Sequence, residues 1–351
     1  MAFLSIPNVK ISGISATVPS KIKEIRNLPF FDKDEAERVI ALTHVERSRI
    51  VNDGQCCSDL CYESAVKLIS ELKWEKSDID AIVFVSLSRD YLTPATACVL
   101  QERLGLSKEC LAFDIPFACS GYVYGLSVLS SMISNGTIKK ALLLVGETTS
   151  VQQSPLDKVL WPLHGDAGTA TALQYDEKAV PMYFHLCSDG SGANAIIQTG
   201  GGTRVPLTPK SFEMKEVEPG VIRNELQGQM DGLSVFSFSV KEPPKSIMRL
   251  CEHFDLNIDE IDYLLLHQAN KYMDDKIKKK VKVPLYAAPA DAISEISTTA
   301  ISKINLSAGT AVTESMITEP DEKATKDLRL TEYNMIVLPS QLEVDDYIDI
   351  R

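Results

Sequence analysis

The sequence predicts an α/β protein made of two similar halves, and two observations support this prediction. Apolar strand-like segments alternate along the chain with segments of helical periodicity. One such unit also recurs, with residues 63–73 leading to a strand at 81–86 and residues 244–254 leading to a strand at 263–266. Asp80 and Asp262 precede the two strands and stand 182 positions apart (262 − 80), about half of the 351 residues. We therefore expect one half at 1–175 and the other at 176–351.

The composition is that of a globular protein with a large core, with 44% hydrophobic residues and a mean hydropathy of −0.02. No stretch approaches the ~20 apolar residues of a membrane helix, and residues 1–7 lack the pattern of a signal peptide. The 8 cysteines are too few for a dense disulfide pattern, and Cys56, Cys57 and Cys61 have no partners at zinc spacing. We expect a cytoplasmic protein with reduced thiols, no bound metal and no membrane contact.

The charge of the chain argues against nucleic acid as a partner, because 36 basic residues face 48 acidic ones and the net charge is −12. Six lysines nevertheless gather within twelve positions: Lys271, Lys276, Lys278, Lys279, Lys280 and Lys282. Such a cluster can attract an acidic ligand or carrier protein. Charge alone is equally compatible with the solvated end of a helix.

The first half contains further elements that the local pattern predicts. The apolar run 112–118 is typical of a buried strand, and the small-residue segment 119–133 is typical of a buried helix entered through a tight turn. Residues 140–147 predict another buried strand, and the glycine turn 161–168 leads into one more. Two later glycine clusters, at 188–194 and at 199–202, predict loops. Neither is followed by a helix with the spacing of a phosphate-binding motif.

Cys119 is the strongest candidate for a reactive residue, because it stands where the strand run ends and the apolar helix begins. A thiol at a helix N-terminus feels the positive end of the helix dipole, which favours the nucleophilic thiolate. The alternative is a buried cysteine that acts as a small hydrophobe. A catalytic role also requires a base elsewhere in the chain.

His267 and Asn305 are the candidate partners of Cys119. His267 follows the second predicted strand, and residues at the carboxyl ends of strands commonly face the ligand crevice of α/β folds. Asn305 precedes a small-residue helix, and its amide can donate to a developing oxyanion. Cys119 lies 39 residues after Asp80 and Asn305 lies 43 after Asp262, which gives them equivalent places in the two halves. Taken singly, His267 also suits a structural role, and Asn305 suits a helix N-cap.

In their joint order, the motifs of this chain resemble the 3-oxoacyl-(acyl-carrier-protein) synthase III family of the thiolase superfamily over roughly residues 8–319. The motifs that carry the resemblance are Thr93-Pro94-Ala95-Thr96-Ala97, Phe113-Asp114, Ala118-Cys119-Ser120-Gly121, Gly165-Asp166-Ala167-Gly168, Ser188-Asp189-Gly190-Ser191-Gly192, Met230-Asp231-Gly232 before Val235-Phe236, and His267-Gln268-Ala269-Asn270. The resemblance implies a thiolase-like, five-layered αβαβα fold of two duplicated α/β halves, usually assembled as a homodimer.

The resemblance also implies a reaction. Cys119 would take an acyl group from acyl-CoA or an acyl carrier, which divides one difficult step into two. His267 and Asn305 would support decarboxylation of malonyl-acyl-carrier-protein and stabilise the resulting enolate. The enolate would attack the acyl-Cys119 carbonyl and give a 3-oxoacyl-carrier product in fatty-acid or related acyl biosynthesis. This chemistry requires no cofactor beyond the CoA thioester that serves as substrate.

Binding residues are implied in the same way. Lys276, Lys279 and Lys280 lie where the family docks its acidic acyl carrier protein. Arg38 stands where bacterial members carry a tryptophan that stacks on the CoA adenine, and arginine can stack on a base or pair with phosphate. We expect Arg38 and Lys271 to contact CoA or the phosphopantetheine of the carrier.

Three positions depart from the family pattern. Arg38 is the first, and Ile304 is the second, because the family usually has a glycine before the residue equivalent to Asn305. The third is Glu332-Tyr333-Asn334, which replaces a Gly-Phe-Gly turn that contributes a backbone N–H to the oxyanion hole. Loss of one such donor typically costs ~2.7–4 kcal/mol of transition-state stabilisation. These departures favour a specialised member with a different acyl donor over the housekeeping starter enzyme.

Two further functions remain open from the sequence. The first is acyl transfer from Cys119 to an alcohol or amine without condensation. The second is a non-catalytic partner subunit of a condensing complex, against which the presence of Cys119, His267 and Asn305 argues. A thiolase is disfavoured because no cysteine follows Cys251, and a hydroxymethylglutaryl-CoA synthase needs a catalytic glutamate that the motifs do not locate.

Overall fold

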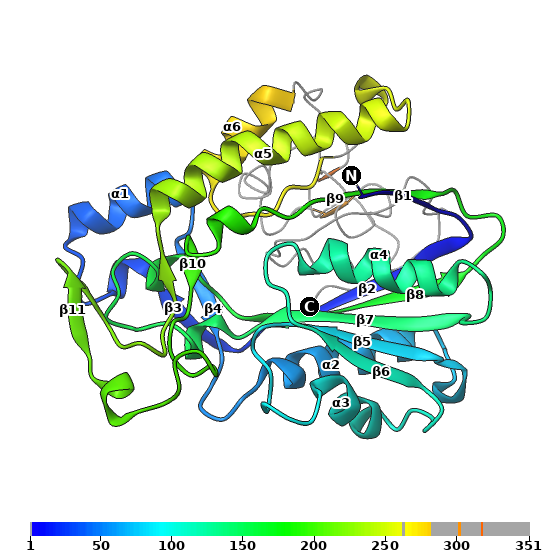
Figure 1. Ribbon diagram of the computed structural model, residues 1–351, viewed down its shortest axis with the longest axis horizontal. Helices are drawn as coiled ribbons and strands as arrows, with labels where there is room; N and C mark the ends of the chain where they lie inside the picture. The colour runs from blue at the N-terminus through cyan, green and yellow to red at the C-terminus, as the bar shows by residue number, and fades with distance from the viewer. Residues whose placement is uncertain (1, 262–263, 282–300, 303–316, 319–351) are drawn as a thin grey trace.

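The computed structural model describes residues 2–261, 264–281, 301–302 and 317–318. Its centre is a 5-stranded sheet with the strand order β2-β8-β7-β5-β6 (Figure 1). The strands are β2 (Val9–Thr17), β5 (Ala81–Val85), β6 (Leu111–Ile115), β7 (Lys140–Glu147) and β8 (Ala167–Tyr175). β5 runs parallel to β6 and β7, whereas β8 is antiparallel to β7 and β2. The chain therefore builds the mixed sheet of an α/β fold.

Continuous apolar sequence explains why β5 and β7 occupy the middle of the sheet. Every residue of β5 is buried, and residues 141–144 of β7 are fully buried. Parallel strands that are covered on both faces have this pattern. β6 is only half-buried, because it lies at the sheet edge and has a single neighbour, β5. The prediction of a buried strand at 112–118 is therefore wrong in its burial, although a strand is present at Leu111–Ile115.

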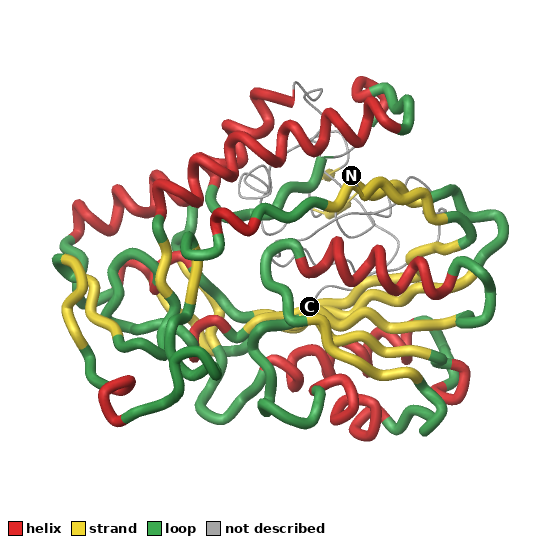
Figure 2. The backbone as a smooth tube through the Cα atoms, in the orientation of Figure 1, coloured by secondary structure: helices red, strands yellow, loops and turns green. Residues whose placement is uncertain are grey.

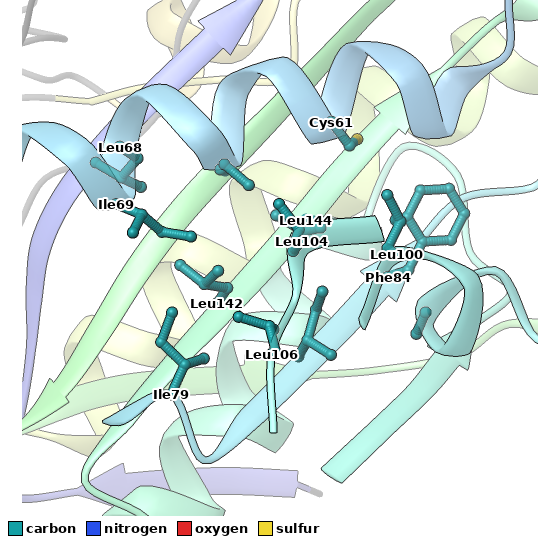
Figure 3. Packing of buried hydrophobic residues seen from close by; sticks show 14 of the residues in the cluster. Cys61, Leu68, Ile69, Ile79, Phe84, Leu100, Leu104, Leu106, Leu142 and Leu144 are labelled. Atoms are coloured by element: carbon teal, nitrogen blue, oxygen red, sulfur yellow. The ribbon is translucent and has the colours of Figure 1, made fainter. Parts of the chain in front are cut away.

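Helices cover both faces of the central sheet (Figure 2). α2 (Cys57–Glu71) and α3 (Thr96–Leu104) lie on one face, and α4 (Gly121–Ile133) lies on the other. Figure 3 shows the packing on the α2–α3 side, where Phe84, Leu142 and Leu144 of the sheet meet the helices. On the other side, Leu129 of α4 packs against the sheet with no exposed surface. Full burial of one such side chain contributes about 1.5–3 kcal/mol.

Two glycines let α2 approach the sheet without an intervening side chain. A Cβ on Gly168 of β8 would lie 2.5 Å from the backbone nitrogen of Cys61 in α2. A Cβ on Gly146 of β7 would lie 2.9 Å from Cys57 Sγ and 2.5 Å from the Ala167 carbonyl oxygen. All three distances are shorter than real Cβ contacts, so the packing requires glycine at both positions.

Smaller elements surround the central sheet. Two-stranded pairs are β1 (Ala2–Ile6) with β9 (Met182–Leu186), β3 (Lys21–Glu24) with β4 (Arg47–Ile50), β10 (Ile196–Ile197) with β13 (Gln229–Met230), β11 (Lys215–Glu218) with β12 (Val221–Arg223), and β14 (Ile301–Ser302) with β15 (Ile317–Thr318). The remaining helices are α1 (Lys33–Thr43), α5 (Gly232–His253) and α6 (Lys271–Val281). α5 packs on α6 and β9, and α6 also contacts α1.

The second half matches its predictions in part. The predicted helix near 244–254 lies within α5. The predicted strand at 263–266 is wrong for its described part, because residues 264–266 form no strand and pair with no strand in the described chain. Asn305, Ile304 and residues 332–334 lie outside the described residues. The division at 175/176 falls where β8 ends and stays a prediction. In the part of the chain that the structure describes, no helix has the length and apolar content needed to cross a membrane.

Candidate active site

Cys119 lies in a tight turn between β6 and α4. The turn ends at Gly121, the first residue of α4, whose N–H donates to the Ala118 carbonyl at 2.7 Å. A Cβ on Gly121 would lie 2.6 Å from Val85 Cγ1, so glycine lets the start of α4 press against the end of β5. The predicted order of strand, tight turn and helix around Cys119 is confirmed.

The turn stands at the edge of the sheet where the three parallel strands end. Val85 of β5 pairs with Ile115 of β6 and with Val145 of β7, so their carboxyl ends are level. β8 begins at the same edge, because Ala167 pairs with Glu147. Ligand crevices of α/β sheets commonly lie outside the carboxyl ends of the strands.

Burial raises the pKa of the Cys119 thiol, a backbone hydrogen bond lowers it, and the charge of Glu147 raises it further. The residue is exposed by surface area, but the atoms packed around its sulfur still displace water from the thiol. The expectation that the helix dipole favours the thiolate is therefore wrong in its net direction. Cys119 precedes the N-cap Ser120, outside the first turn of α4, where the dipole is weak compared with the loss of hydration.

Glu147 lies at the carboxyl end of β7, and its charge raises the pKa of the Cys119 thiol. The Leu87 N–H donates to one of its carboxyl oxygens at 2.7 Å, and the Ser88 hydroxyl donates to the other at 2.6 Å. Burial raises the pKa of Glu147, and these hydrogen bonds oppose the rise. Sequence reasoning did not single out Glu147. An acidic residue at the end of an otherwise apolar strand is the signal that identifies it.

His267 lies three residues before Asn270, whose side chain caps α6 by accepting the Met273 N–H at 2.9 Å. Loss of hydration lowers the pKa of His267, and the nearby Asp274 carboxylate opposes this. The ring is exposed by surface area, so the desolvation comes from atoms that crowd it without covering it. A lowered pKa keeps the imidazole neutral at neutral pH, which lets one ring nitrogen donate a hydrogen bond without a full charge.

His164 is a second imidazole near His267, and sequence reasoning missed it. Burial lowers the pKa of His164 most, and the fields of Lys23 and His267 lower it further. Its Nδ1 lies 3.0 Å from the Leu160 carbonyl, and Lys23 Nζ donates to the His164 carbonyl at 2.6 Å. His164 stands three residues before Ala167, the first residue of β8. His164 therefore lies close in sequence to the edge where β8 begins, and the field of His267 reaches its ring.

The predicted catalytic residues therefore gather only in part. The charge of Glu147 raises the pKa of the Cys119 thiol, and the field of His267 contributes to the lowered pKa of His164. Within the described residues, no hydrogen bond joins Cys119 directly to His267. Asn305 is not among those residues, so its predicted role stays a prediction.

The predicted binding residues lie on two helices that touch. Arg38 is exposed on α1, where its Nε donates to the Asp34 carbonyl at 3.1 Å. Lys271 begins α6 and pairs with Asp275 at 3.3 Å. Because α1 contacts α6, these two cations belong to neighbouring elements.

The lysines of α6 form an exposed face. Ile277 is buried, whereas Lys276, Lys279 and Lys280 are exposed. Lys276 Nζ lies 5.0 Å from the centre of the Tyr272 ring. Lys280 Nζ donates to the Val240 carbonyl of α5 at 2.6 Å, so this lysine also joins the two helices.

Known proteins resemble this chain over most of its length. A family model described as 3-oxoacyl-[acyl-carrier-protein (ACP)] synthase III matches residues 113–190, which include Cys119 and Glu147. A protein of Campylobacter jejuni named putative 3-oxoacyl-[acyl-carrier-protein] synthase 3 is 32% identical over 278 residues, or 78% of each chain. The chain belongs to the 3-oxoacyl-(acyl-carrier-protein) synthase III family. A Clostridium perfringens member named beta-ketoacyl-[acyl-carrier-protein] synthase III is 31% identical, covering 79% of this chain and 82% of the relative.

Solved structures of the synthase III family agree with the fold. A crystal structure of 3-oxoacyl-(acyl-carrier-protein) synthase III superposes with a TM-score of 0.77 at 32% identity, covering 81% of this chain and 85% of that one. A 3-oxoacyl-(acyl-carrier protein) synthase from Burkholderia xenovorans gives a TM-score of 0.76 at 33% identity, covering 82% and 81%. The thiolase-like α/β fold is confirmed, and the protein is a condensing enzyme of the thiolase superfamily.

Proposed function

We propose that this synthase III family member loads an acyl group from acyl-CoA onto Cys119 and condenses it with malonyl-acyl-carrier-protein. The observation that carries the proposal is the position of Cys119 in the turn at the carboxyl ends of β5, β6 and β7. Its relatives are named for the 3-oxoacyl-carrier product, which supports the same reaction here.

The proposed reaction has two stages. In the first, the Cys119 thiolate attacks the acyl thioester, a sulfur–carbon bond forms, and CoA leaves as its thiol after taking a proton. In the second, malonyl-carrier loses CO₂ and the enolate oxygen accepts hydrogen bonds from His267 and Asn305. The enolate carbon then attacks the acyl carbonyl and releases Cys119. The lowered pKa of His267 supports this role, because it keeps the imidazole neutral with one N–H available to donate to the enolate oxygen.

We assign Arg38 and Lys271 to the phosphates of CoA or phosphopantetheine, and Lys276, Lys279 and Lys280 to the acidic surface of the carrier. The contact between α1 and α6 supports this assignment, because it makes Arg38 a residue of the element next to the helix that carries the lysines. His267 precedes α6 by four residues, so a carrier bound on α6 lies close to the proposed condensing residues.

We also propose that the protein is a homodimer. β6 is an edge strand in the described part of the chain, and its outer backbone groups are available for pairing with a second copy. The half-exposed Leu111 and Phe117 flank this edge. Light scattering after size exclusion measures the mass, and a stable mass of one chain at micromolar concentration would contradict the dimer.

Intact-protein mass spectrometry tests the loading step. The wild type is incubated with a panel of acyl-CoA and acyl-carrier thioesters, beside Cys119→Ala and the matched control Cys98→Ala. We expect one acyl mass on the wild type and on Cys98→Ala, and none on Cys119→Ala. If no donor labels Cys119, the non-catalytic partner subunit becomes the better description.

Glu147 favours a second candidate function, which is transfer of the acyl group from Cys119 to a hydroxyl or amine. A carboxylate close to the acyl thioester can take the proton of such an acceptor. Adding malonyl-carrier to the acylated protein separates the two functions. Condensation gives a 3-oxoacyl-carrier and CO₂, whereas simple transfer leaves the malonyl group intact.

A further inference from the structure

A second cysteine with a histidine partner lies outside the Cys119 turn. Cys187 directly follows β9, and its Sγ is 3.1 Å from Nε2 of His185. The other ring nitrogen of His185, Nδ1, is 2.8 Å from Oγ of Ser246 in α5. A nucleophile, a base and a group that orients the base therefore form one hydrogen-bonded line.

The hydrogen bonds of His185 suit proton uptake. When Nδ1–H donates to the Ser246 hydroxyl, Nε2 carries the lone pair that accepts the Cys187 proton. Phe3 of β1 stacks on the imidazole, with ring centroids 4.4 Å apart and 12° between the planes. The pairing of Phe3 with His185 in the β1–β9 ladder holds this stack in place.

The backbone of Cys187 is also fixed. Tyr124 of α4 donates its hydroxyl to the Cys187 carbonyl at 2.9 Å. The Tyr124 ring stacks on Phe117 at a centroid distance of 4.6 Å. The backbone of Cys187 is therefore held at the start of the loop after β9, and its thiol points toward His185.

A histidine partner sets Cys187 apart from the other two exposed thiols, which are Cys98 and the proposed catalytic Cys119. All 8 cysteines lie in the described residues and are free. Cys57, Cys61 and Cys251 are buried, whereas Cys187 is exposed. Cys98 is also exposed, and its thiol donates to the Ala112 carbonyl at 3.8 Å. A backbone carbonyl is not a base, so it does not remove the thiol proton. Cys98 is therefore the matched reference for Cys187.

We propose that Cys187 is a thiol–disulfide exchange site that reacts with low-molecular-weight disulfides. His185 Nε2 takes the Cys187 proton, and the thiolate attacks one sulfur of the disulfide. A new sulfur–sulfur bond forms on Cys187 as the original one breaks, and the second sulfur leaves as a thiolate that takes the proton from His185. Cys187 is oxidised to a mixed disulfide, and the incoming disulfide is reduced by the same two electrons.

Oxidised glutathione is the probe for this site. The full-length protein is incubated with it at pH 7, remaining thiols are alkylated, and each cysteine-containing peptide is quantified by mass spectrometry over time. We expect Cys187 to form its mixed disulfide about tenfold faster than Cys98, or more, because a hydrogen-bonded base lets Cys187 attack as its thiolate. Equal rates at Cys187 and Cys98 would overturn the proposal.

Variants of the base separate its effect from simple exposure. His185→Gln is expected to slow Cys187 to the rate of Cys98 and to leave Cys98 unchanged, and an unchanged Cys187 rate would count against the site. Because His185→Gln also removes the stack on Phe3, circular dichroism checks its fold. Ser246→Ala leaves that stack intact. If His185→Gln does not fold, the rate of mixed-disulfide formation at Cys187 in Ser246→Ala tests the role of His185. A severalfold slower reaction supports the role of His185, and an unaltered rate contradicts it.

Discussion

Burial is the main cause of the raised pKa of the Cys119 thiol, and the charge of Glu147 adds a smaller contribution. The ionised Glu147 carboxylate raises the pKa of the Cys119 thiol, so its removal favours the thiolate. Glu147→Gln removes the charge and keeps an oxygen that accepts the Leu87 N–H. We expect the pH midpoint for alkylation of Cys119 by iodoacetamide to move to lower pH in this variant, measured on the Cys119 peptide by mass spectrometry.

Glu147→Asp is the control for this measurement, because it keeps the carboxylate. Its alkylation midpoint should stay closer to that of the wild type than the midpoint of Glu147→Gln. An identical midpoint in all three proteins would show that Glu147 exerts no field on the thiol.

Lys23 makes the stability of the fold depend on pH. Burial lowers the pKa of Lys23 from 10.5 to about 8, and Asp166 opposes the shift. Between these two values the unfolded chain binds more protons than the folded one, so this residue's contribution makes stability rise with pH. A shift of this size corresponds to about 3 kcal/mol of unfolding free energy. The fold lacks this stability below pH 8 and recovers it as the pH approaches 10.5.

Lys23→Met isolates that contribution. The variant loses the hydrogen bond to the His164 carbonyl at every pH, which adds a constant offset. We expect the unfolding free energy of the wild type, relative to Lys23→Met, to increase by about 2–3 kcal/mol from pH 7 to pH 10 in urea titrations. A difference that stays constant with pH would rule out the shifted lysine.

At the residue scale, the sequence identifies groups whose local pattern is informative. Cys119 and His267 stand at abrupt changes from apolar to reactive residues, so they are visible without a structure. Glu147 and His164 acquire their importance from neighbours distant in the chain, such as Leu87 and Lys23. The net direction of the Cys119 pKa shift also depends on packing, which the sequence does not display.

At the scale of elements, the contact between α2 and β8 leaves no room for a methyl group. We expect Gly168→Ala to lower the unfolding free energy by about 3 kcal/mol, because its Cβ would meet the α2 backbone. Gly202→Ala is the matched control, since a Cβ there has nothing within 4 Å, and its effect should stay below about 0.5 kcal/mol. Urea unfolding measures both, and equal midpoints would contradict the close packing.

Element predictions succeeded where burial and apolar pattern coincide. β7 spans the predicted residues 140–147, and α4 begins two residues into the predicted segment 119–133. β6 has the expected apolar sequence, but it lies at the sheet edge, so its residues are only partly buried. Residues 264–266 are equally apolar, and without a neighbouring strand in the described chain they form no ladder.

At the scale of the whole molecule, a basic face on an acidic protein suits an acidic carrier. With a net charge of −12, non-specific attraction to an acidic carrier is disfavoured, so the proposed docking assigns carrier binding to the α6 lysines. Replacing Lys276 and Lys279 together with glutamate should weaken carrier binding roughly tenfold at low salt, and less at high salt. The control Lys178→Glu lies in the turn between β8 and β9, and titration calorimetry should find it unchanged.

The α/β class and the family follow from the sequence, because both depend on motif order along the chain. The duplication and the position of Asn305 depend on how the second half packs, and they stay predictions. The sequence also does not predict that β5, β6 and β7 end, and β8 begins, at one edge of the sheet. Strand order depends on tertiary contacts between segments distant in the chain.

The open side of β6 has a consequence for how the protein is made. A single folded chain leaves the outer side of this strand without a strand partner in its described part, although the Ala112 carbonyl there accepts a weak hydrogen bond from Cys98 Sγ. Such an edge is a template for any extended peptide, including unfolded copies of the same chain. Fast synthesis at high temperature should therefore favour insoluble aggregates, whereas slow synthesis leaves time for the proposed dimer to form and cover this edge.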